Sequence, residues 1–481
     1  MKSRFKSLSH PKTLAQAIVR CFLLNVIYGS GALLLCALIA PATRAQTFTS
    51  LASFNGTDGA NPFFASLVQG LDGDFYGTTS ARGAHGHGTV FKIMPTGTVT
   101  TLYSFCAKSK CADGSVPYGG LVLGMDGNFY GMTFTGGTLN AGTVYKITPA
   151  GTLTTMHSFK FSDGYNPYDA LVQGADGNFY GTTTYGGAQL IGNVFKMTPQ
   201  GVVTNLHSFN SSDGSEPEAS LVQSTDGNFY GTTYNGGSSG SYGTAFKITP
   251  AGVFTTLHFF EDSVDGRSIV SGLVQARDGT FYGTASLGGP LGYGTVYTMT
   301  PAGAVTVLHN FDTTDGSSPN MLALATDGNF YGTTISSGAN GDGTVFEITP
   351  SGALTTLHNF NGADGSFTFA GLAQSTDGSL YGVTQVGGSK NDGTVFRMAV
   401  GLGPFVKTVP TSGRVGASVK ILGTHLTRAT SVNFNGSAAT FTVVSASEIT
   451  ATVPATATTG TVQVDTSGGS LLSNAPFHVR H

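Results

Sequence analysis

Six tyrosines lie in loop segments of variable sequence between recurring motifs, and their chemistry is that of a binding surface. A tyrosine presents a flat apolar ring and a hydroxyl group, so it can stack on a sugar ring or pack against a protein partner. The alternative for each single ring is packing onto the strands beneath it. The predicted ligand-binding residues are Tyr118, Tyr168, Tyr185, Tyr234, Tyr242 and Tyr293, and the same loops also carry Phe63, Phe64, Tyr165, Phe367 and Phe369.

Two acidic pairs outside the recurring turns are the candidates for catalysis: Glu216 with Glu218, and Glu261 with Asp262. Two carboxyl groups suffice for glycoside hydrolysis when they flank the bond, but neighbours on one short loop do not flank a sugar well. The sequence contains no His-Glu-x-x-His motif, no phosphate-binding loop and no nucleophile elbow. We therefore predict no catalytic residue and no cofactor. A polysaccharide-active glycoside hydrolase or lyase is the alternative.

Cys106 and Cys111 are the only cysteines after residue 45. In an exported chain such a pair predicts one disulfide bond. The alternative is a two-thiolate corner of a metal site, but a zinc site needs four ligands and the sequence places no histidine near this pair. His85 and His87 could offer two nitrogen ligands, yet their glycine-rich loop shows no third ligand. We therefore predict a disulfide bond, a solvated histidine loop and no metal site.

The elements that would position these side chains come from a tandem repeat. A tyrosine in a Phe-Tyr-Gly or Leu-Tyr-Gly motif recurs seven times at a spacing of about 51 residues. The 70 glycines, 33 phenylalanines and 18 tyrosines, with only 10% charged residues, indicate many short strands joined by tight turns. The sequence therefore predicts an all-β fold with a seven-bladed β-propeller over residues 46–402. In the third copy the predicted strands span residues 170–174, 179–184, 193–198 and 202–209. The seven tyrosines are Tyr76, Tyr130, Tyr180, Tyr230, Tyr282, Tyr331 and Tyr381.

Two Asp-Gly turns recur in each copy. This dipeptide supplies the positive φ that a tight turn needs, so turn formation alone explains the carboxylates. Calcium is the alternative, but it takes about six to eight oxygen ligands and each turn offers one carboxylate. The first set contains Asp72, Asp126, Asp176, Asp226, Asp278, Asp327 and Asp377, and the second set contains Asp58, Asp113, Asp163, Asp213, Asp265, Asp315 and Asp364.

Histidine recurs in the outer strand of five copies, and glutamine in the inner strand of five. Equivalent outer-strand positions should lie about 15 Å apart, because about three strand spacings already separate the outer strand from the inner one. The histidines then cannot share one metal ion, and we predict that they pack between blades. The glutamines either line the channel or bond the next blade. These residues are His157, His207, His258, His309 and His358, and Gln69, Gln173, Gln223, Gln275 and Gln374.

The two ends of the repeat array are complementary. Residues 47–54 match the outer strand of the later copies, whereas the seventh copy ends near Ala399 without one. We predict that the N-terminal strand completes the last blade, which closes the ring and removes two open sheet edges.

The motifs Asp-Gly-Asn-Phe-Tyr-Gly-Thr-Thr, Gly-Gly and Gly-Thr-Val-Phe-Lys-Ile-Thr-Pro recur from residue 47 to about residue 400. This run of copies resembles the GloVer tandem repeat of bacterial choice-of-anchor surface proteins. The resemblance implies an exported repeat protein that is usually followed by an anchoring or sorting tail, and it implies no established reaction. The sequence has no hydrophobic tail after the repeats, which departs from that pattern.

Residues 403–481 lack the Phe-Tyr-Gly motif and alternate valine with threonine, which predicts a small β-sandwich. The segments Gly416 to Gly423 and Val432 to Gly436, with Val453-Pro454, resemble an IPT/TIG immunoglobulin-like domain. Such domains are commonly spacers or binding modules in extracellular bacterial proteins. The resemblance therefore implies an interaction role and contributes no catalytic residue.

Residues 1–45 contain six basic residues and no acidic one, with an apolar run before a small-residue site that ends at Ala45. This pattern predicts a signal peptide cleaved after Ala45. An uncleaved membrane anchor over Cys21 to Ala40 is the alternative. Loss of the six basic residues takes the net charge from −3 to −9, and with no basic stripe this argues against nucleic acid as a partner. We expect a monomer that is secreted, periplasmic or at the cell surface of a bacterium.

The variable aromatic loops, the appended immunoglobulin-like module and the missing catalytic motifs favour an exported, non-catalytic binding or surface-interaction protein. Its partner would be a polysaccharide or another surface protein, bound by loops on one face of the propeller. The alternatives are the polysaccharide-active enzyme and a structural spacer with no small ligand.

Overall fold

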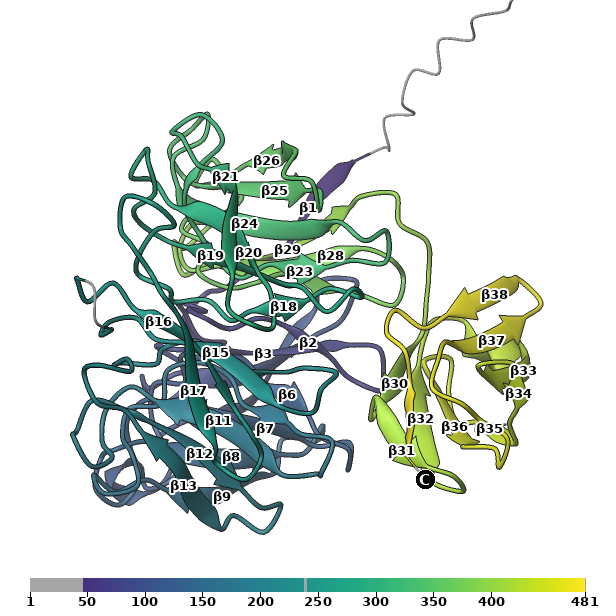
Figure 1. Ribbon diagram of the computed structural model, residues 1–481. Helices are drawn as coiled ribbons and strands as arrows, with labels where there is room; N and C mark the ends of the chain where they lie inside the picture. The colour runs from purple at the N-terminus through teal and green to yellow at the C-terminus, as the bar shows by residue number, and fades with distance from the viewer. Residues whose placement is uncertain (1–45, 238–239, 481) are drawn as a thin grey trace, which may run out of the picture. The chain divides into compact units, whose positions relative to one another are not determined.

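A computed structural model describes residues 46–237 and 240–480 (Figure 1). The expected signal peptide, residues 1–45, lies outside the described residues. The described part contains two short 3₁₀ helices, η1 (Ser109–Cys111) and η2 (Leu426–Arg428), and all its other regular elements are strands. Within residues 46–237 and 240–480, no helix is both long enough and apolar enough to cross a bilayer.

Seven antiparallel sheets follow the seven copies of the repeat. The first six are, in chain order, β2 (Val68–Gln69), β3 (Phe75–Thr79), β4 (Thr89–Ile93) and β5 (Val99–Ser104); β6 (Val122–Leu123), β7 (Phe129–Thr133), β8 (Thr143–Ile147) and β9 (Leu153–Ser158); β10 (Val172–Gln173), β11 (Phe179–Thr183), β12 (Asn193–Met197) and β13 (Val203–Ser208); β14 (Val222–Gln223), β15 (Phe229–Thr232), β16 (Thr244–Ile248) and β17 (Phe254–Phe259); β18 (Val274–Gln275), β19 (Phe281–Ala285), β20 (Thr295–Met299) and β21 (Val305–Asn310); and β22 (Ser317–Pro319), β23 (Ala323–Leu324), β24 (Phe330–Ser336), β25 (Thr344–Ile348) and β26 (Leu354–Asn359).

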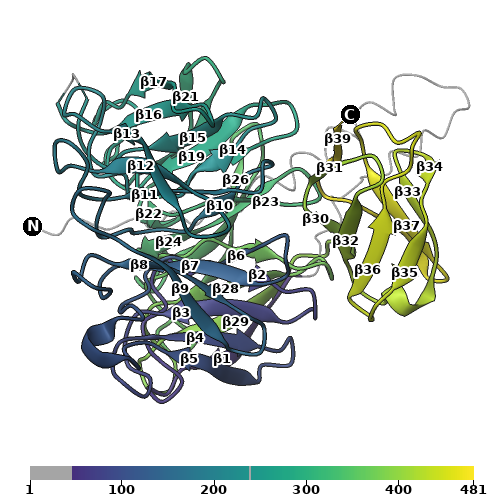
Figure 2. The same ribbon diagram turned by 90° about the horizontal axis from the view of Figure 1, so that it is seen from below.

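The seventh sheet combines the two ends of the repeat array. It contains β27 (Ala373–Gln374), β28 (Leu380–Thr384), β29 (Thr394–Ala399) and the first strand of the described chain, β1 (Thr47–Ser53). β1 runs antiparallel to β29, with Thr47 opposite Ala399 and Ser53 opposite Thr394. The two strands lie side by side in both views (Figures 1 and 2). The N-terminal strand thus occupies the outer position that the seventh copy lacks.

The Phe-Tyr-Gly motif joins neighbouring sheets because consecutive side chains of a strand point to opposite faces. The tyrosine ring of one sheet packs on the phenylalanine ring of the next, as in Tyr180 and Phe229, whose ring centroids lie 3.9 Å apart. The same contact joins Tyr381 of the seventh sheet to Phe75 of the first at 4.1 Å. The other pairs of this kind are Tyr76 with Phe129, Tyr130 with Phe179, Tyr230 with Phe281, and Tyr282 with Phe330.

The first set of Asp-Gly turns does more than reverse the chain. Gly177 adopts a φ of +84° in the turn between β10 and β11, as the motif predicts. The carboxylate of Asp176 in this turn accepts a hydrogen bond of 2.8 Å from the hydroxyl group of Tyr180. The prediction that turn formation alone explains these aspartates is therefore incomplete, because the same bond ties the buried tyrosine to its turn. It recurs at Asp72, Asp126, Asp226 and Asp327.

The glutamines of the inner strands bond the neighbouring sheet. The side-chain oxygen of Gln173 accepts a hydrogen bond of 2.9 Å from the amide of Met125 in the preceding sheet. In the same way Gln69 of the first sheet accepts the amide of Thr376 in the seventh at 3.0 Å. The further pairs are Gln223 with Ala175, Gln275 with Thr225, and Gln374 with Thr326.

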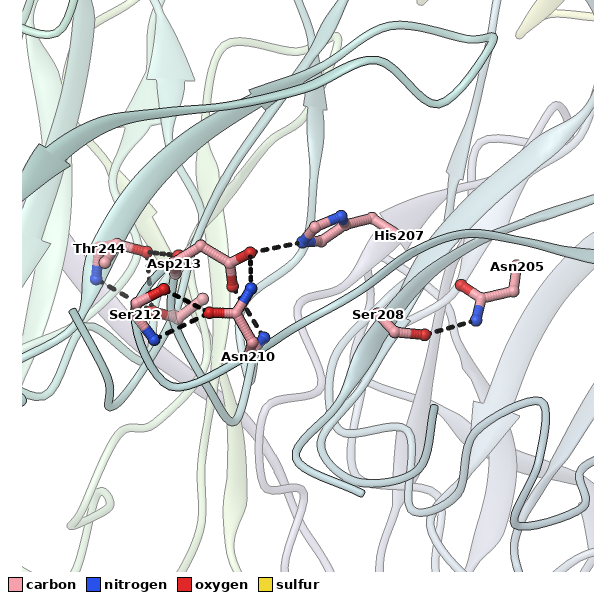
Figure 3. A network of polar contacts seen from close by, with 8 residues as sticks. Asn205, His207, Ser208, Asn210, Ser212, Asp213 and Thr244 are labelled. Carbon is pink, nitrogen blue, oxygen red and sulfur yellow. Dashed lines mark hydrogen bonds and ion pairs between the residues drawn. The ribbon is translucent and has the colours of Figure 1, made fainter. Parts of the chain in front are cut away.

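The outer-strand histidines pair with the second set of aspartates, as the close-up of His207 illustrates (Figure 3). His207 Nε2 donates to Asp213 Oδ2 at 3.2 Å, and the backbone amide of Asn210 donates to Asp213 Oδ1 at 2.9 Å. The imidazole ring also stacks on Phe254 of the next sheet at 3.7 Å, so the predicted packing between sheets occurs here. These aspartates hold the loop after the outer strand in place. The other pairs are His157 with Asp163, His258 with Asp265, His309 with Asp315 and His358 with Asp364.

The C-terminal residues form two further four-stranded sheets and one parallel strand pair. Valine, isoleucine, leucine and phenylalanine side chains of both sheets gather in one buried cluster around Val419, Val432 and Phe477, as expected for a sandwich. The strands are β30 (Lys407–Val409), β32 (Ser418–Leu422), β36 (Glu448–Thr452) and β35 (Phe441–Val443); β34 (Ser437–Ala438), β33 (Ala429–Phe434), β37 (Val462–Thr466) and β38 (Gly469–Leu472); and the pair β31 (Ser412–Arg414) and β39 (His478–Arg480).

Candidate functional site

The candidate site is built on the loops that lead from each outer strand into the next inner strand. In the third copy Asn166 has a left-handed backbone, with φ of +54°, and its amide donates a hydrogen bond of 2.9 Å to Ala141 O of the preceding copy. Glu216 has the same conformation and the same kind of bond, 2.8 Å to Ile191 O. Because each loop is fixed in this way at one residue, the side chains two positions later occupy equivalent places in different copies.

Aromatic rings from four copies meet at these equivalent places. Phe63 of the first copy packs against Phe369 of the seventh at a centroid distance of 4.6 Å and against Tyr118 of the second at 5.2 Å. Tyr168 of the third copy contacts Tyr118 at 5.4 Å and Phe64 at 5.1 Å. These distances are those of attractive ring pairs. We call Phe63, Phe64, Tyr118, Phe134, Tyr168 and Phe369 the aromatic cluster.

A pair of acidic residues from the fourth copy lies beside this cluster. Glu218 occupies the loop position that Tyr168 occupies in the third copy. Burial, reinforced by the charge of Glu216, raises the pKa of Glu218 to about 7. Glu216 is held by Asn235, whose side-chain amide donates to Glu216 Oε2 at 2.7 Å. The site therefore offers one carboxylate that is fixed by a hydrogen bond and one carboxyl group that titrates near neutrality.

Three of the six predicted tyrosines lie near the acidic pair, and a fourth contacts one of these three. Burial raises the pKa of Tyr168, and the nearby charge of Glu218 raises it further. Burial also raises the pKa of Tyr185, and Glu216 and Glu218 contribute to this shift. Tyr185 stacks on Tyr165 at 5.4 Å. The remaining two tyrosines of the group are Tyr118, through its contact with Tyr168, and Tyr234, whose amide donates to Glu216 O at 3.0 Å and whose side chain interacts with Tyr168.

The other two predicted tyrosines lie elsewhere. Tyr242 is half-buried and packs against the core cluster that contains Phe260 and Phe281. Tyr293 is 41% exposed in the loop between β19 and β20. Among the described residues, no ring contact joins Tyr242 or Tyr293 to the aromatic cluster. The structure thus brings together four of the six tyrosines.

Two residues that sequence reasoning missed contribute to the site. Phe134 contacts Tyr118 at 4.8 Å and Tyr168 at 5.9 Å. It occupies the position that Tyr234 occupies in the fourth copy, so register within the repeat was the available signal. Asp169 is buried and accepts the amide of Ser220 at 2.9 Å, which ties the third loop to the fourth. Burial raises the pKa of Asp169 to about 6.

The cysteine pair forms the predicted disulfide bond, Cys106–Cys111. The expectation that no histidine lies near this pair is wrong, because His87 lies with its ligand nitrogen within 4.8 Å of both sulfur atoms. His87 is also less solvated than expected, since it is half-buried and its Nδ1 forms a hydrogen bond of 2.8 Å with Ser115 Oγ. The loops of the first two copies meet here, which their separation in the sequence concealed.

Glu218 gives the site a distinct pH dependence. Its folded pKa of about 7 lies above the unfolded value of 4.5, so the folded state binds the proton more tightly. The resulting contribution to stability is fully present below pH 4.5 and is lost as the pH rises through about 7. Relative to Glu218→Gln, the wild-type chain should lose at most about 3 kcal/mol between pH 4.5 and pH 8, measured by denaturant unfolding at a series of pH values. Identical pH profiles for the two chains would contradict this assignment.

Solved structures resemble this chain in fold. Streptogramin B lyase aligns with a TM-score of 0.53 at 14% identity, over 74% of this chain and 97% of the lyase chain. A luciferin-regenerating enzyme aligns with a TM-score of 0.41 at 11% identity, over 75% and 98% of the two chains. A gluconolactonase from Xanthomonas campestris aligns with a TM-score of 0.38 at 12% identity, over 61% and 89%. The similarity to the lyase supports a β-propeller-like fold and nothing about the reaction.

No curated protein matches this chain in sequence. Its C-terminal residues 404–479 match the model of the IPT/TIG domain, as the sequence motifs predicted. Three overlapping segments, residues 37–159, 106–289 and 224–440, match the model of the Gloeobacter/Verrucomicrobia repeat. Together they span most of the chain, which therefore belongs to the Gloeobacter/Verrucomicrobia repeat family.

Proposed function

We propose that this chain is an exported, non-catalytic binding protein whose aromatic loops hold a polysaccharide. The observation that carries the proposal is the position of Tyr168, Tyr185 and Tyr234 beside Glu216 and Glu218, with Tyr118 packed on Tyr168. Aromatic faces stack on the apolar faces of sugar rings, while carboxyl and amide groups bond the hydroxyl groups at their edges. The expected net charge of −9 for the exported chain also disfavours nucleic acid as the ligand.

The architecture that presents this site is, in our proposal, a single seven-bladed propeller closed by β1. Three contacts support closure. The pairing of β1 with β29 joins the two ends of the repeat array within the seventh sheet. The packing of Tyr381 on Phe75 and the hydrogen bond between Gln69 and Thr376 join the seventh sheet to the first. The aromatic cluster supports it too, because Phe63 of the first copy touches both Tyr118 and Phe369. A closed ring places the seven entry loops around one axis and so allows loops distant in sequence to share one ligand.

Export and the monomeric state complete the proposal. The signal-peptide pattern of residues 1–45 and the Cys106–Cys111 disulfide both fit a secreted, periplasmic or cell-surface protein. The chain would meet the membrane only if residues 1–45 were retained. Another surface protein is the other class of partner that the aromatic loops could bind.

Binding should depend on the clustered tyrosines. The chain should be retained by an insoluble polysaccharide, and the double variant Tyr185→Ala/Tyr234→Ala should bind about tenfold more weakly, because two stacking surfaces next to the acidic pair are lost. The measurement is the dissociation constant from pull-down against a panel of soluble and insoluble polysaccharides.

Tyr293→Ala is the matched control, since this tyrosine is exposed in the loop between β19 and β20 and does not belong to the group of Tyr118, Tyr168, Tyr185 and Tyr234. The affinity of this variant should remain within about twofold of the wild type. Equal loss in the control and in the double variant would argue that the site lies elsewhere. No retention by any polysaccharide would refute the carbohydrate proposal and leave a protein partner or a spacer role.

The pair Glu216 and Glu218 favours a polysaccharide-active enzyme as the second candidate. Catalytic carboxyl pairs are recognised by environments that push their pKa values apart, and burial raises that of Glu218 to about 7. We expect no release of reducing ends from the polysaccharides in the binding assay. Release that disappears in Glu218→Gln would replace binding by glycoside cleavage as the function.

A further inference from the structure

We propose that His87, Cys106 and Cys111 form a thiol-gated zinc site, closed while the disulfide bond is intact and opened when that bond is reduced. The proposal is independent of the carbohydrate site. It concerns three side chains that the loops of the first two copies bring together.

The three potential ligand atoms already lie nearly where one ion would hold them. They lie within 4.8 Å of one another, and all three residues are half-buried. Ligand atoms around a tetrahedral zinc ion lie roughly 3.5 Å apart, given Zn–S and Zn–N bonds of about 2.3 and 2.1 Å. The site therefore needs only separation of the two sulfur atoms after reduction and small rotations of the side chains. Three protein ligands leave the fourth position of the ion for water.

His87 is oriented for this role by its other ring nitrogen. Its Nδ1 forms a hydrogen bond of 2.8 Å with Ser115 Oγ, and its backbone oxygen accepts the amide of Val116 at 3.0 Å. In the tautomer in which Nδ1 donates to Ser115 Oγ, Nε2 carries no proton and is available to a metal ion. Histidines that bind metals are usually fixed by a hydrogen bond of this kind.

The cysteine loop is held by contacts that do not involve the disulfide bond. The buried carboxylate of Asp113 accepts the amides of Ala107 and Lys108 at 2.9 and 3.1 Å and the hydroxyl group of Tyr103 at 2.7 Å. The carbonyl oxygen of Cys111 accepts the amide of Gly137 at 2.9 Å. Reduction should therefore leave both thiols near His87 instead of releasing the loop.

The steps balance as a two-electron reduction followed by metal binding. A dithiol reductant transfers two electrons and two protons to the Cys106–Cys111 bond, which becomes two thiols, while the reductant closes to a disulfide. Zinc then binds both sulfur atoms as thiolates and displaces their two protons to solvent. Oxidation of the thiols would expel the ion.

The test measures zinc binding by the full chain with Cys21 and Cys36 replaced by serine, so that Cys106 and Cys111 are its only thiols. The protein is reduced with a phosphine, which does not compete for the metal as dithiols do, and is dialysed anaerobically against zinc. We expect one zinc per reduced chain and none per oxidised chain. Cobalt in place of zinc should give the thiolate charge-transfer absorption that identifies sulfur ligands.

Two variants separate this site from adventitious binding. His87→Ala should weaken zinc binding by the reduced chain at least about tenfold, whereas His85→Ala, which removes an exposed histidine from the same loop, should leave it unchanged. Cys106→Ser/Cys111→Ser should abolish it. Equal binding by oxidised and reduced chains, an unchanged affinity in His87→Ala, or a reduced chain that keeps its melting temperature but binds no zinc would each overturn the proposal. A reduced chain that unfolds would also overturn it, because the loop contacts would then not suffice.

Discussion

Removal of residues 46–55 should lower the melting temperature of the chain by about 10 °C. The deletion removes β1, which pairs with β29 from Thr47 to Ser53 apart from a register shift at Leu51. It also removes Phe54, which is 1% exposed, and Phe48, which stacks on His358 at 3.7 Å. Loss of two packed phenylalanines and of one row of backbone hydrogen bonds should cost about 10 kcal/mol. Dividing this loss of free energy by the unfolding entropy of the described chain, about 2.1 cal/mol/K for each residue, gives the expected shift in melting temperature. Calorimetry measures this shift.

Substitutions in β1 and at Phe54, the residue that follows it, separate side-chain packing from strand pairing. Phe48→Ala/Phe54→Ala should lose about 6 kcal/mol of unfolding free energy. The control, Thr47→Ala/Thr49→Ala/Ser50→Ala, changes three exposed residues of the same strand and should lose less than about 1 kcal/mol. An unchanged melt after the deletion would refute closure of the seventh sheet by β1.

Asp265→Ala should destabilise the chain by about 3 kcal/mol. Asp265 is 4% exposed, and its carboxylate accepts His258 Nε2 at 2.6 Å and the amide of Glu261 at 2.7 Å. Alanine leaves both donors without their acceptor in a largely water-free place, and hydrogen bonds to a charged group cost more to lose than neutral ones. Denaturant unfolding measures the loss of unfolding free energy, with the same dependence of that free energy on denaturant concentration used for both chains.

The other Asp-Gly turn of the same copy provides the control. Asp278 is exposed, and its carboxylate accepts the amide of Thr280 at 3.0 Å. Asp278→Ala should therefore cost less than about 1 kcal/mol. Equal losses in the two variants would contradict the distinction between a turn aspartate and one that anchors the loop through histidine.

The strands of this fold could be read from the sequence because the repeat presents each element seven times. In the third copy the strands expected at residues 179–184 and 193–198 occur as β11 and β12. The inner strand was overestimated: residues 170–174 were expected, but β10 contains only Val172 and Gln173.

The partners of repeated side chains were harder to predict because pairing within a loop leaves no periodic signal. His207 and Asp213 are six residues apart and recur together, yet either could be explained alone, by packing or by turn formation. The contact of His87 with the cysteine pair arises only when the loops of the first two copies meet. The aromatic cluster could be predicted only in part. Loop position identified the six candidate tyrosines, but only the packing of the folded chain shows that Tyr168 belongs to the cluster and that Tyr242 and Tyr293 do not.

The pairing of β1 with β29 also sets the order in which the chain can assemble during synthesis. Six sheets consist of strands that follow one another along the chain, so each can form as soon as its own copy has emerged. Thr47 must instead wait for Ala399, which is made about 20 to 70 seconds later at common elongation rates of about 5–20 residues per second. During that interval β1 lacks its hydrogen-bonding partner strand, so the seventh sheet can be completed only after the other six copies have been synthesised.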